Sequence, residues 1–163
     1  MQKIIRIDEA DEALLKDMSA DCYVLNTAIK DDFCQQFITA AETKVVLFYG
    51  DKALEKCKSF GADGIIIDLG DEDLKEKMTA LRKELGKDKY IGLITRSRRH
   101  ESMLVSEVEP DFVVFKVYKD GFDKLKELTD WYEEFFLIQS AAWIMEDGVP
   151  VDELKTDFVI VGV

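Results

Sequence analysis

The sequence contains little cysteine and histidine. Its 163 residues include three cysteines, Cys22, Cys34 and Cys57, and one histidine, His100. The cysteines are odd in number and form no C-x-x-C pair, so we expect neither a disulfide framework nor a structural zinc site. This cysteine usage is typical of a reduced, cytoplasmic protein.

Long apolar runs and an excess of positive charge are also absent. No run approaches the roughly 20 apolar residues that a helix needs to cross a bilayer, and the first residues do not have the pattern of a signal peptide. The net charge is −12, whereas binding to phosphate backbones depends on lysine and arginine. We therefore expect no membrane and no nucleic-acid partner, and we attribute the acidic charge to solubility.

Linkers, low-complexity tracts and charge blocks are missing as well. A single domain over residues 1–163 is therefore predicted. A chain of about this length buries roughly 70 % of its unfolded surface, which is enough for a sizeable core.

Short apolar runs dominate the sequence, and an aspartate precedes every second one. Asp21, Asp63, Asp111 and Asp157 stand 42, 48 and 46 residues apart, and each is followed by an apolar run. Four further apolar runs complete the pattern, and β-branched and aromatic residues are frequent among them, as in strands. The predicted strands cover residues 4–7, 22–25, 45–49, 65–67, 91–94, 112–115, 135–138 and 158–161.

Helical periodicity appears between the predicted strands. It is clearest over residues 71–85, where Leu74, Met78, Leu81 and Leu85 form one apolar stripe. Further helices are predicted at residues 9–18, 31–41, 51–60, 100–108 (with Met103, Leu104 and Val108 inward) and 122–132, and a short one through Leu154.

The alternation of strands and helices predicts parallel β-α-β units. Nearly continuous apolar strands indicate burial on both faces, as parallel sheets require. An open doubly wound sheet, which usually has five or six strands, is one solution. The eight runs favour the other, a compact (β/α)8 TIM-type barrel that lacks the last helix. The missing cover beside the first and eighth strands would expose apolar surface, so we expect a homodimer.

In a TIM-type barrel the functional residues follow the carboxyl ends of the strands. The acidic residues that follow the third and fourth predicted strands suit Mg²⁺ bound to a phosphate. They could equally be helix caps that accept backbone N–H bonds. The acidic residues are Asp51, Asp68, Asp71 and Asp73.

A basic group follows the fifth and sixth predicted strands. Arginine forks match phosphate or carboxylate geometry, so this group predicts binding of a phosphorylated or anionic small molecule. Solvated charges paired with surface acids are the alternative. His100 could serve as a general acid or base, or lie in an exposed first turn. The group comprises Arg96, Arg98, Arg99, His100, Lys116 and Lys119, and the seventh predicted strand places Gln139 and Ser140 at the same end.

The motif G-A-D-G-I at residues 61–65, followed by D-E-D-L at 71–74, resembles the thiamine phosphate synthase family. I-G-L-I-T at 91–95 and P-D-F-V at 110–113 follow in the same order. The resemblance implies a transferase of thiamine biosynthesis that joins a pyrimidine pyrophosphate to a thiazole phosphate, with magnesium on the pyrophosphate. It places Asp51 and Asp73 near the metal ligands and Thr95 near a substrate-binding hydroxyl.

The sequence departs from this family at its phosphate loops. Gln139, Ser140, Ala141 and Ala142 replace the glycine-rich loop after the seventh strand, and the small-residue loop after the eighth strand is missing. Two functions therefore stay open. One is a barrel that binds a phosphorylated small molecule and catalyses this transfer. The other is a non-catalytic oligomeric binding or scaffold protein that kept the barrel and lost the reaction.

Overall fold

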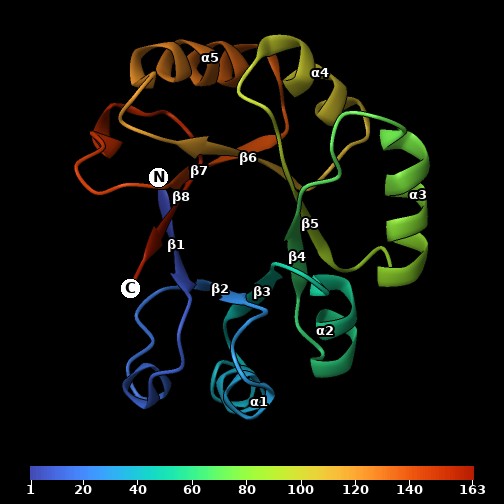
Figure 1. The fold of residues 1–163 in the computed structure, drawn as a ribbon, viewed down its shortest axis with the longest axis vertical. Coiled ribbons are helices and arrows are strands. Elements are labelled where there is room, and N and C mark those ends of the chain that lie inside the picture. Colours follow the sequence, from blue (N-terminus) through green and yellow to red (C-terminus); the bar gives the residue numbers. More distant parts are fainter.

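A computed structural model describes residues 1–163 as one closed barrel of eight parallel strands in sequential order (Figure 1). The barrel closes where β8 pairs with β1, for example Ile160 opposite Ile4. The closed barrel predicted from the eight apolar runs is confirmed, and the open sheet is excluded. The strands are β1 (Gln2–Ile7), β2 (Cys22–Asn26), β3 (Val45–Tyr49), β4 (Gly64–Ile67), β5 (Tyr90–Ile94), β6 (Phe112–Val117), β7 (Gln139–Ile144) and β8 (Phe158–Gly162).

Five α-helices surround only part of the barrel. They connect the strands from β2 to β7, whereas β1–β2 and β7–β8 are joined through short 3-10 helices and no helix follows β8. In Figure 1 the side on which β8, β1 and both termini lie has no α-helix beside it. No α-helix has the length and apolar character needed to cross a membrane. The helices are α1 (Asp31–Ala40), α2 (Ala53–Phe60), α3 (Leu74–Leu85), α4 (Arg99–Glu107) and α5 (Phe122–Phe135), and the 3-10 helices are η1 (Glu12–Leu15) and η2 (Val151–Glu153).

The seventh predicted strand is wrong. The run at 135–138 lies at the end of α5 and in the turn after it, and β7 begins only at Gln139. Phe136 stacks on Tyr132, with ring centroids 4.6 Å apart and planes at 7°, whereas Phe135 and Leu137 are exposed. The true strand, Q-S-A-A-W-I, contains small and polar residues that carry little apolar signal.

Two helix predictions also need correction. Residues 9–18 contain only the 3-10 turn η1, where the Asp11 carboxylate accepts the N–H of Ala13. In α4 the buried residues are Ser102, Val105 and Ser106. Leu104 and Val108 pack against the core as predicted, whereas Met103 is 42 % exposed and its inward placement is wrong. Small serines allow α4 to approach its neighbours, and the Ser106 and Tyr132 hydroxyls share a hydrogen bond of 2.7 Å.

The recurring aspartates have a common structural role at the amino ends of the strands. Asp63 accepts the N–H of Val46 at 2.8 Å, Asp111 that of Ile91 at 2.7 Å and Asp157 that of Ser140 at 2.9 Å. Each carboxylate therefore fastens the start of the preceding strand. Asp21 departs from this pattern because its side chain is exposed and forms a 3.7 Å ion pair with Lys44.

Side chains alternate between the barrel interior and the layer under the helices, since successive residues of a strand point to opposite faces. On β6, Phe112 and Val114 belong to the interior cluster, whereas Val113 and Phe115 pack under the helices. Of the cysteines, Cys34 and Cys57 are buried in the helix layer, and Cys22 is half-buried and lies against the interior cluster.

Candidate functional site

The carboxyl-end mouth, meaning the opening of the barrel at the carboxyl ends of the strands, has an aromatic floor. Trp143 on β7 belongs to the interior cluster and is only 2 % exposed. Its ring lies edge-on to Tyr49 of β3, with centroids 4.5 Å apart. These two rings fill the interior below the mouth, so a ligand there would contact the rim and the upper face of this aromatic pair.

Arg6 of β1 also belongs to this mouth. Its guanidinium carbon lies 5.7 Å from the centroid of Trp143, and its Nε donates to Asp8 at 2.8 Å. Asn26 donates to the other oxygen of Asp8 at 3.4 Å. Sequence reasoning did not select Arg6 or Trp143. The sequence feature that could have pointed to Arg6 is that it is the one charged residue inside the first apolar run.

Lys116 and Lys119 reach the carboxyl-end mouth as predicted. Lys116 lies on β6 directly opposite Trp143 in the strand register and is half-buried. By alternation it shares the interior face with Val114. Neither lysine takes part in any of the eight ion pairs. The backbone N–H of Lys119 donates to the Glu146 carboxylate at 2.7 Å, which links the loop after β6 to the loop after β7.

Thr95 points away from the barrel interior, and two of the arginines that follow β5 pair with acidic side chains. Because Ile94 points into the interior, Thr95 points outward, where its hydroxyl donates to the Arg96 carbonyl at 3.1 Å. Arg96 pairs with Asp71 at 3.4 Å, and Arg98 pairs with Glu101 at 3.8 Å. Both arginines therefore have the acidic partners that the alternative interpretation expected, and their binding role stays a prediction.

Asp51 and Asp73 are exposed at the starts of α2 and α3 and do not form a pre-built metal site. No three acidic, histidine or cysteine side chains are grouped so that they could hold a metal ion. Neither carboxylate makes a cap hydrogen bond, so the helix-cap interpretation is wrong for these two residues. Magnesium usually takes one or two protein carboxylates plus substrate phosphates. A role for Asp51 or Asp73 therefore requires oxygens from the ligand.

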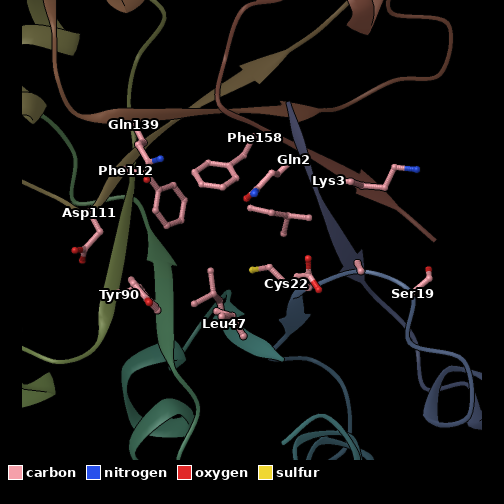
Figure 2. A pocket seen from close by; sticks show the side chains of 14 residues that line it. Gln2, Lys3, Ser19, Cys22, Leu47, Tyr90, Asp111, Phe112, Gln139 and Phe158 are labelled. Carbon is pink, nitrogen blue, oxygen red and sulfur yellow. The ribbon is translucent and has the colours of Figure 1, made fainter. Parts of the chain in front are cut away.

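The placement of Gln139 and Ser140 at the carboxyl-end mouth is wrong. Because β7 begins at Gln139, both residues lie at the amino end of the barrel. Gln139 lines a cavity there, visible in Figure 2. Ser140 is buried, its N–H is bound by Asp157, and its hydroxyl has no partner. The error follows directly from the shifted seventh strand.

Comparison with protein-family models gives no match. Among curated proteins, a thiamine-phosphate synthase from Erythrobacter litoralis (strain HTCC2594) is 29 % identical over 127 residues, which cover 71 % of this chain and 58 % of that protein. The chain resembles thiamine-phosphate synthase. The resemblance expected from the G-A-D-G-I motif is thereby confirmed, although the chain spans less than two thirds of this relative's length.

Solved structures agree on the fold. The chain superposes on a protein from Aquifex aeolicus VF5 with a TM-score of 0.72 at 12 % identity, covering 99 % of this chain and 83 % of the other. A thiamine phosphate pyrophosphorylase from Pyrococcus furiosus superposes with a TM-score of 0.68 at 11 % identity, covering 99 % of this chain and 85 % of the other. A tryptophan synthase from M. tuberculosis superposes with a TM-score of 0.67 at 13 % identity, covering 99 % of this chain and 82 % of the other. At these identities the likeness shows a shared barrel and nothing finer.

Proposed function

We propose that this thiamine-phosphate-synthase-like barrel binds a phosphorylated small molecule at its carboxyl-end mouth. The observation that carries the proposal is Lys116, a half-buried residue without an ion pair, opposite Trp143 at the end of β6. Its unpaired ammonium group is available to an anionic partner, and hydrogen bonds between ionised groups are strong. Lys119 on the next loop supplies further positive charge, whereas Arg6 across the floor is already paired with Asp8. The resemblance to thiamine-phosphate synthase supports a phosphate ester as that anion.

The reaction that we propose at this site is transfer of a pyrimidine group, as in thiamine biosynthesis. The bond between the pyrimidine-bearing carbon and the pyrophosphate oxygen breaks, and pyrophosphate leaves with the electron pair. A carbon–nitrogen bond to the thiazole phosphate forms. Lys116 would hold phosphate oxygens, and the half-buried ring of Tyr49 would support a flat ring by aromatic packing.

Magnesium is part of this proposal only together with the ligand. Asp51 and Asp73 would hold the ion jointly with pyrophosphate oxygens. When bound, it would neutralise charge on the leaving group. We expect magnesium to bind with pyrophosphate and to show little binding alone.

Calorimetric titration of the full chain with pyrophosphate and magnesium tests the proposal. Replacing Lys116 by alanine should weaken binding about tenfold or more, because hydrogen bonds to charged groups contribute about 1.5–3 kcal/mol. Adding Arg96→Ala to the Lys116→Ala variant should weaken pyrophosphate binding by a smaller further factor, since Arg96 already pairs with Asp71.

Lys124→Ala is the matched control, because it removes the same charge from an exposed position on α5. It should leave pyrophosphate binding unchanged. Equal binding by the Lys116→Ala variant and the parent would refute the assignment. Product formation from the pyrimidine pyrophosphate and the thiazole phosphate then tests turnover separately.

A non-catalytic oligomeric module is the second candidate, and the uncovered side of the barrel favours it. Ile5 of β1 and Val161 of β8 lie opposite each other in register, both half-buried, on a face that no α-helix covers. A second copy could bury this surface, so we expect a homodimer.

Sedimentation measurements should therefore give a dimer, and Val161→Lys should shift it to a monomer because the introduced charge would be buried unpaired. A parent protein that sediments as a monomer at micromolar concentration would contradict the dimer. A stable dimer with no pyrophosphate binding would favour the module over the enzyme.

A further inference from the structure

A hollow lies at the amino-end mouth, at the opposite end from the site described above. It has a volume of about 530 Å³, which falls in the range of about 300–1,000 Å³ that is usual for small-molecule sites. Figure 2 shows the rings of Phe112 and Phe158 and the sulfur of Cys22 directed into one space. Ile4, Val45 and Leu47 complete the apolar wall.

Two glycines allow close packing in the strands beside this hollow. Gly64 and Gly92 occupy positions where interior side chains would otherwise stand, on β4 and β5. A Cβ at Gly64 would overlap the Tyr90 carbonyl, and one at Gly92 would overlap the Phe112 ring. The ring of Phe112 therefore lies over Gly92, at one side of the interior. The space between the two phenylalanines and Cys22 is left without a side chain to fill it.

The walls of this cavity favour an aromatic ring. The centroids of Phe112 and Phe158 lie 6.1 Å apart with planes at 59°, an arrangement that leaves ring faces and edges free to pack against another ring. Desolvation by burial, reinforced by the charge of Asp63, raises the pKa of the Cys22 thiol to about 12. Cys22 is therefore a neutral, apolar part of the wall.

Neutral amides supply the polar atoms at the rim. Gln2 and Gln139 both line the cavity and are exposed, and a side-chain amide can donate and accept hydrogen bonds. The acidic rim residue Asp111 is occupied, because Arg82 and the N–H of Ile91 both bind its carboxylate. Figure 2 shows its carboxylate directed away from the cavity. Lys3 and Asp21 also line the cavity. Figure 2 shows the Lys3 side chain directed away from the cavity, and the exposed Asp21 carboxylate pairs with Lys44 at 3.7 Å. The two neutral amides are therefore the rim groups that remain for hydrogen bonds to a ligand.

We propose that the amino-end mouth binds a neutral, flat aromatic molecule that carries an amide-like group. Its ring packs between the two phenylalanines and the aliphatic wall, and its polar group meets Gln2 and Gln139. Interior side chains, including Ile66, Val114 and Ile160, separate this cavity from the Trp143 floor. The proposal is therefore independent of the phosphate site at the other mouth.

The probe for this site is 2-naphthamide, titrated into the full chain labelled with ¹³C at isoleucine, leucine and valine methyl groups. We expect saturable shifts at Ile4, Val45 and Leu47, and unchanged signals at Ile144 near the opposite mouth. A dissociation constant of about 1 mM or tighter is expected for a ligand of this size. The anion 2-naphthoate should bind at least about tenfold more weakly, because burying a carboxylate in an apolar wall is unfavourable.

Val45→Phe should weaken 2-naphthamide binding at least about tenfold without lowering the melting temperature, because the new ring fills existing space. Cys22→Leu, a smaller change on the same wall, provides a second test if Val45→Phe does not fold. Val163→Phe adds the same ring at an exposed position beyond β8 and should leave binding unchanged.

Saturating pyrophosphate should not displace the probe, which separates this site from the proposed phosphate site. The proposal is overturned if the probe shifts no cavity methyl group, if both filling variants bind it as the parent does, or if pyrophosphate competes with it.

Discussion

Replacing Trp143 by alanine should lower the free energy of unfolding by about 3–5 kcal/mol, the usual loss when a large buried aromatic is removed. The indole is 2 % exposed and contacts the ring of Tyr49 and the guanidinium of Arg6. Neighbouring side chains are fixed on separate strands of a closed barrel, so they cannot collapse far into the space. Chemical denaturation followed by circular dichroism measures the loss.

Two comparison variants test whether the lost stability comes from removing the buried aromatic ring. Trp143→Phe keeps an aromatic ring in the floor and should recover much of the lost stability. Trp131→Ala removes an indole that is only half-buried and packs on Arg99 and Phe136 outside the barrel, so it should be less harmful. If Trp143→Ala unfolded at the same denaturant concentration as the parent, the floor described above would not exist in solution.

Asp111→Ala should cost about 2–3 kcal/mol of stability. The carboxylate accepts the N–H of Ile91 and a guanidinium hydrogen of Arg82, both at 2.7 Å. Its removal leaves the part-buried N–H of Ile91 without a partner, and such an unsatisfied group costs about 1–3 kcal/mol. The loss of the Arg82 pair adds a smaller amount because both side chains are partly exposed.

Asp21→Ala is the matched control for this prediction. Asp21 precedes β2 just as Asp111 precedes β6, yet its carboxylate is exposed and accepts no backbone N–H. Its removal should change stability by no more than about 0.5 kcal/mol. Asp111→Asn keeps an acceptor oxygen, so its loss of stability should lie between those of Asp111→Ala and Asp21→Ala. Equal losses for Asp21→Ala and Asp111→Ala would show that the aspartate repeat has no strand-fastening role.

The aspartate repeat shows how far sequence reasoning reached. The spacing of the four aspartates correctly predicted four equivalent strands and, with the runs between them, the closed barrel. The structure gives the reason for the alternation, because three of the carboxylates bind N–H groups near the starts of neighbouring strands. That contact joins residues 17 or 20 positions apart, so it depends on the pairing of adjacent parallel strands.

The seventh strand shows where apolar content misleads. Phe136 continues the stripe of α5, four residues after Tyr132, and the helix interpretation of that run was available from its spacing. The small side chains of β7 were passed over because Ala141 and Ala142 carry little hydrophobic signal, although both are fully buried. One misplaced strand then moved Gln139 and Ser140 to the wrong end of the barrel.

The candidate site was predicted in part. Lys116 and Lys119 reach the carboxyl-end mouth because they follow β6 directly, and position after a strand is a local property. Thr95 also follows its strand, but the two-residue alternation turns it outward once Ile94 points inward. Arg6 and Trp143 were missed because each lies inside a strand, where sequence reasoning looked for core.

The sequence by itself determined the number and order of the strands, the parallel barrel and the positions of most helices, because periodicity and turn residues act over a few positions. Only the tertiary structure decided which side chains meet. Closing the barrel brings Trp143 to Tyr49 and Arg6, gathers Phe112, Phe158 and Cys22 around one cavity, and pairs Arg96 with Asp71. These contacts depend on strand register and on the direction of each side chain, which residue spacing along the chain does not specify.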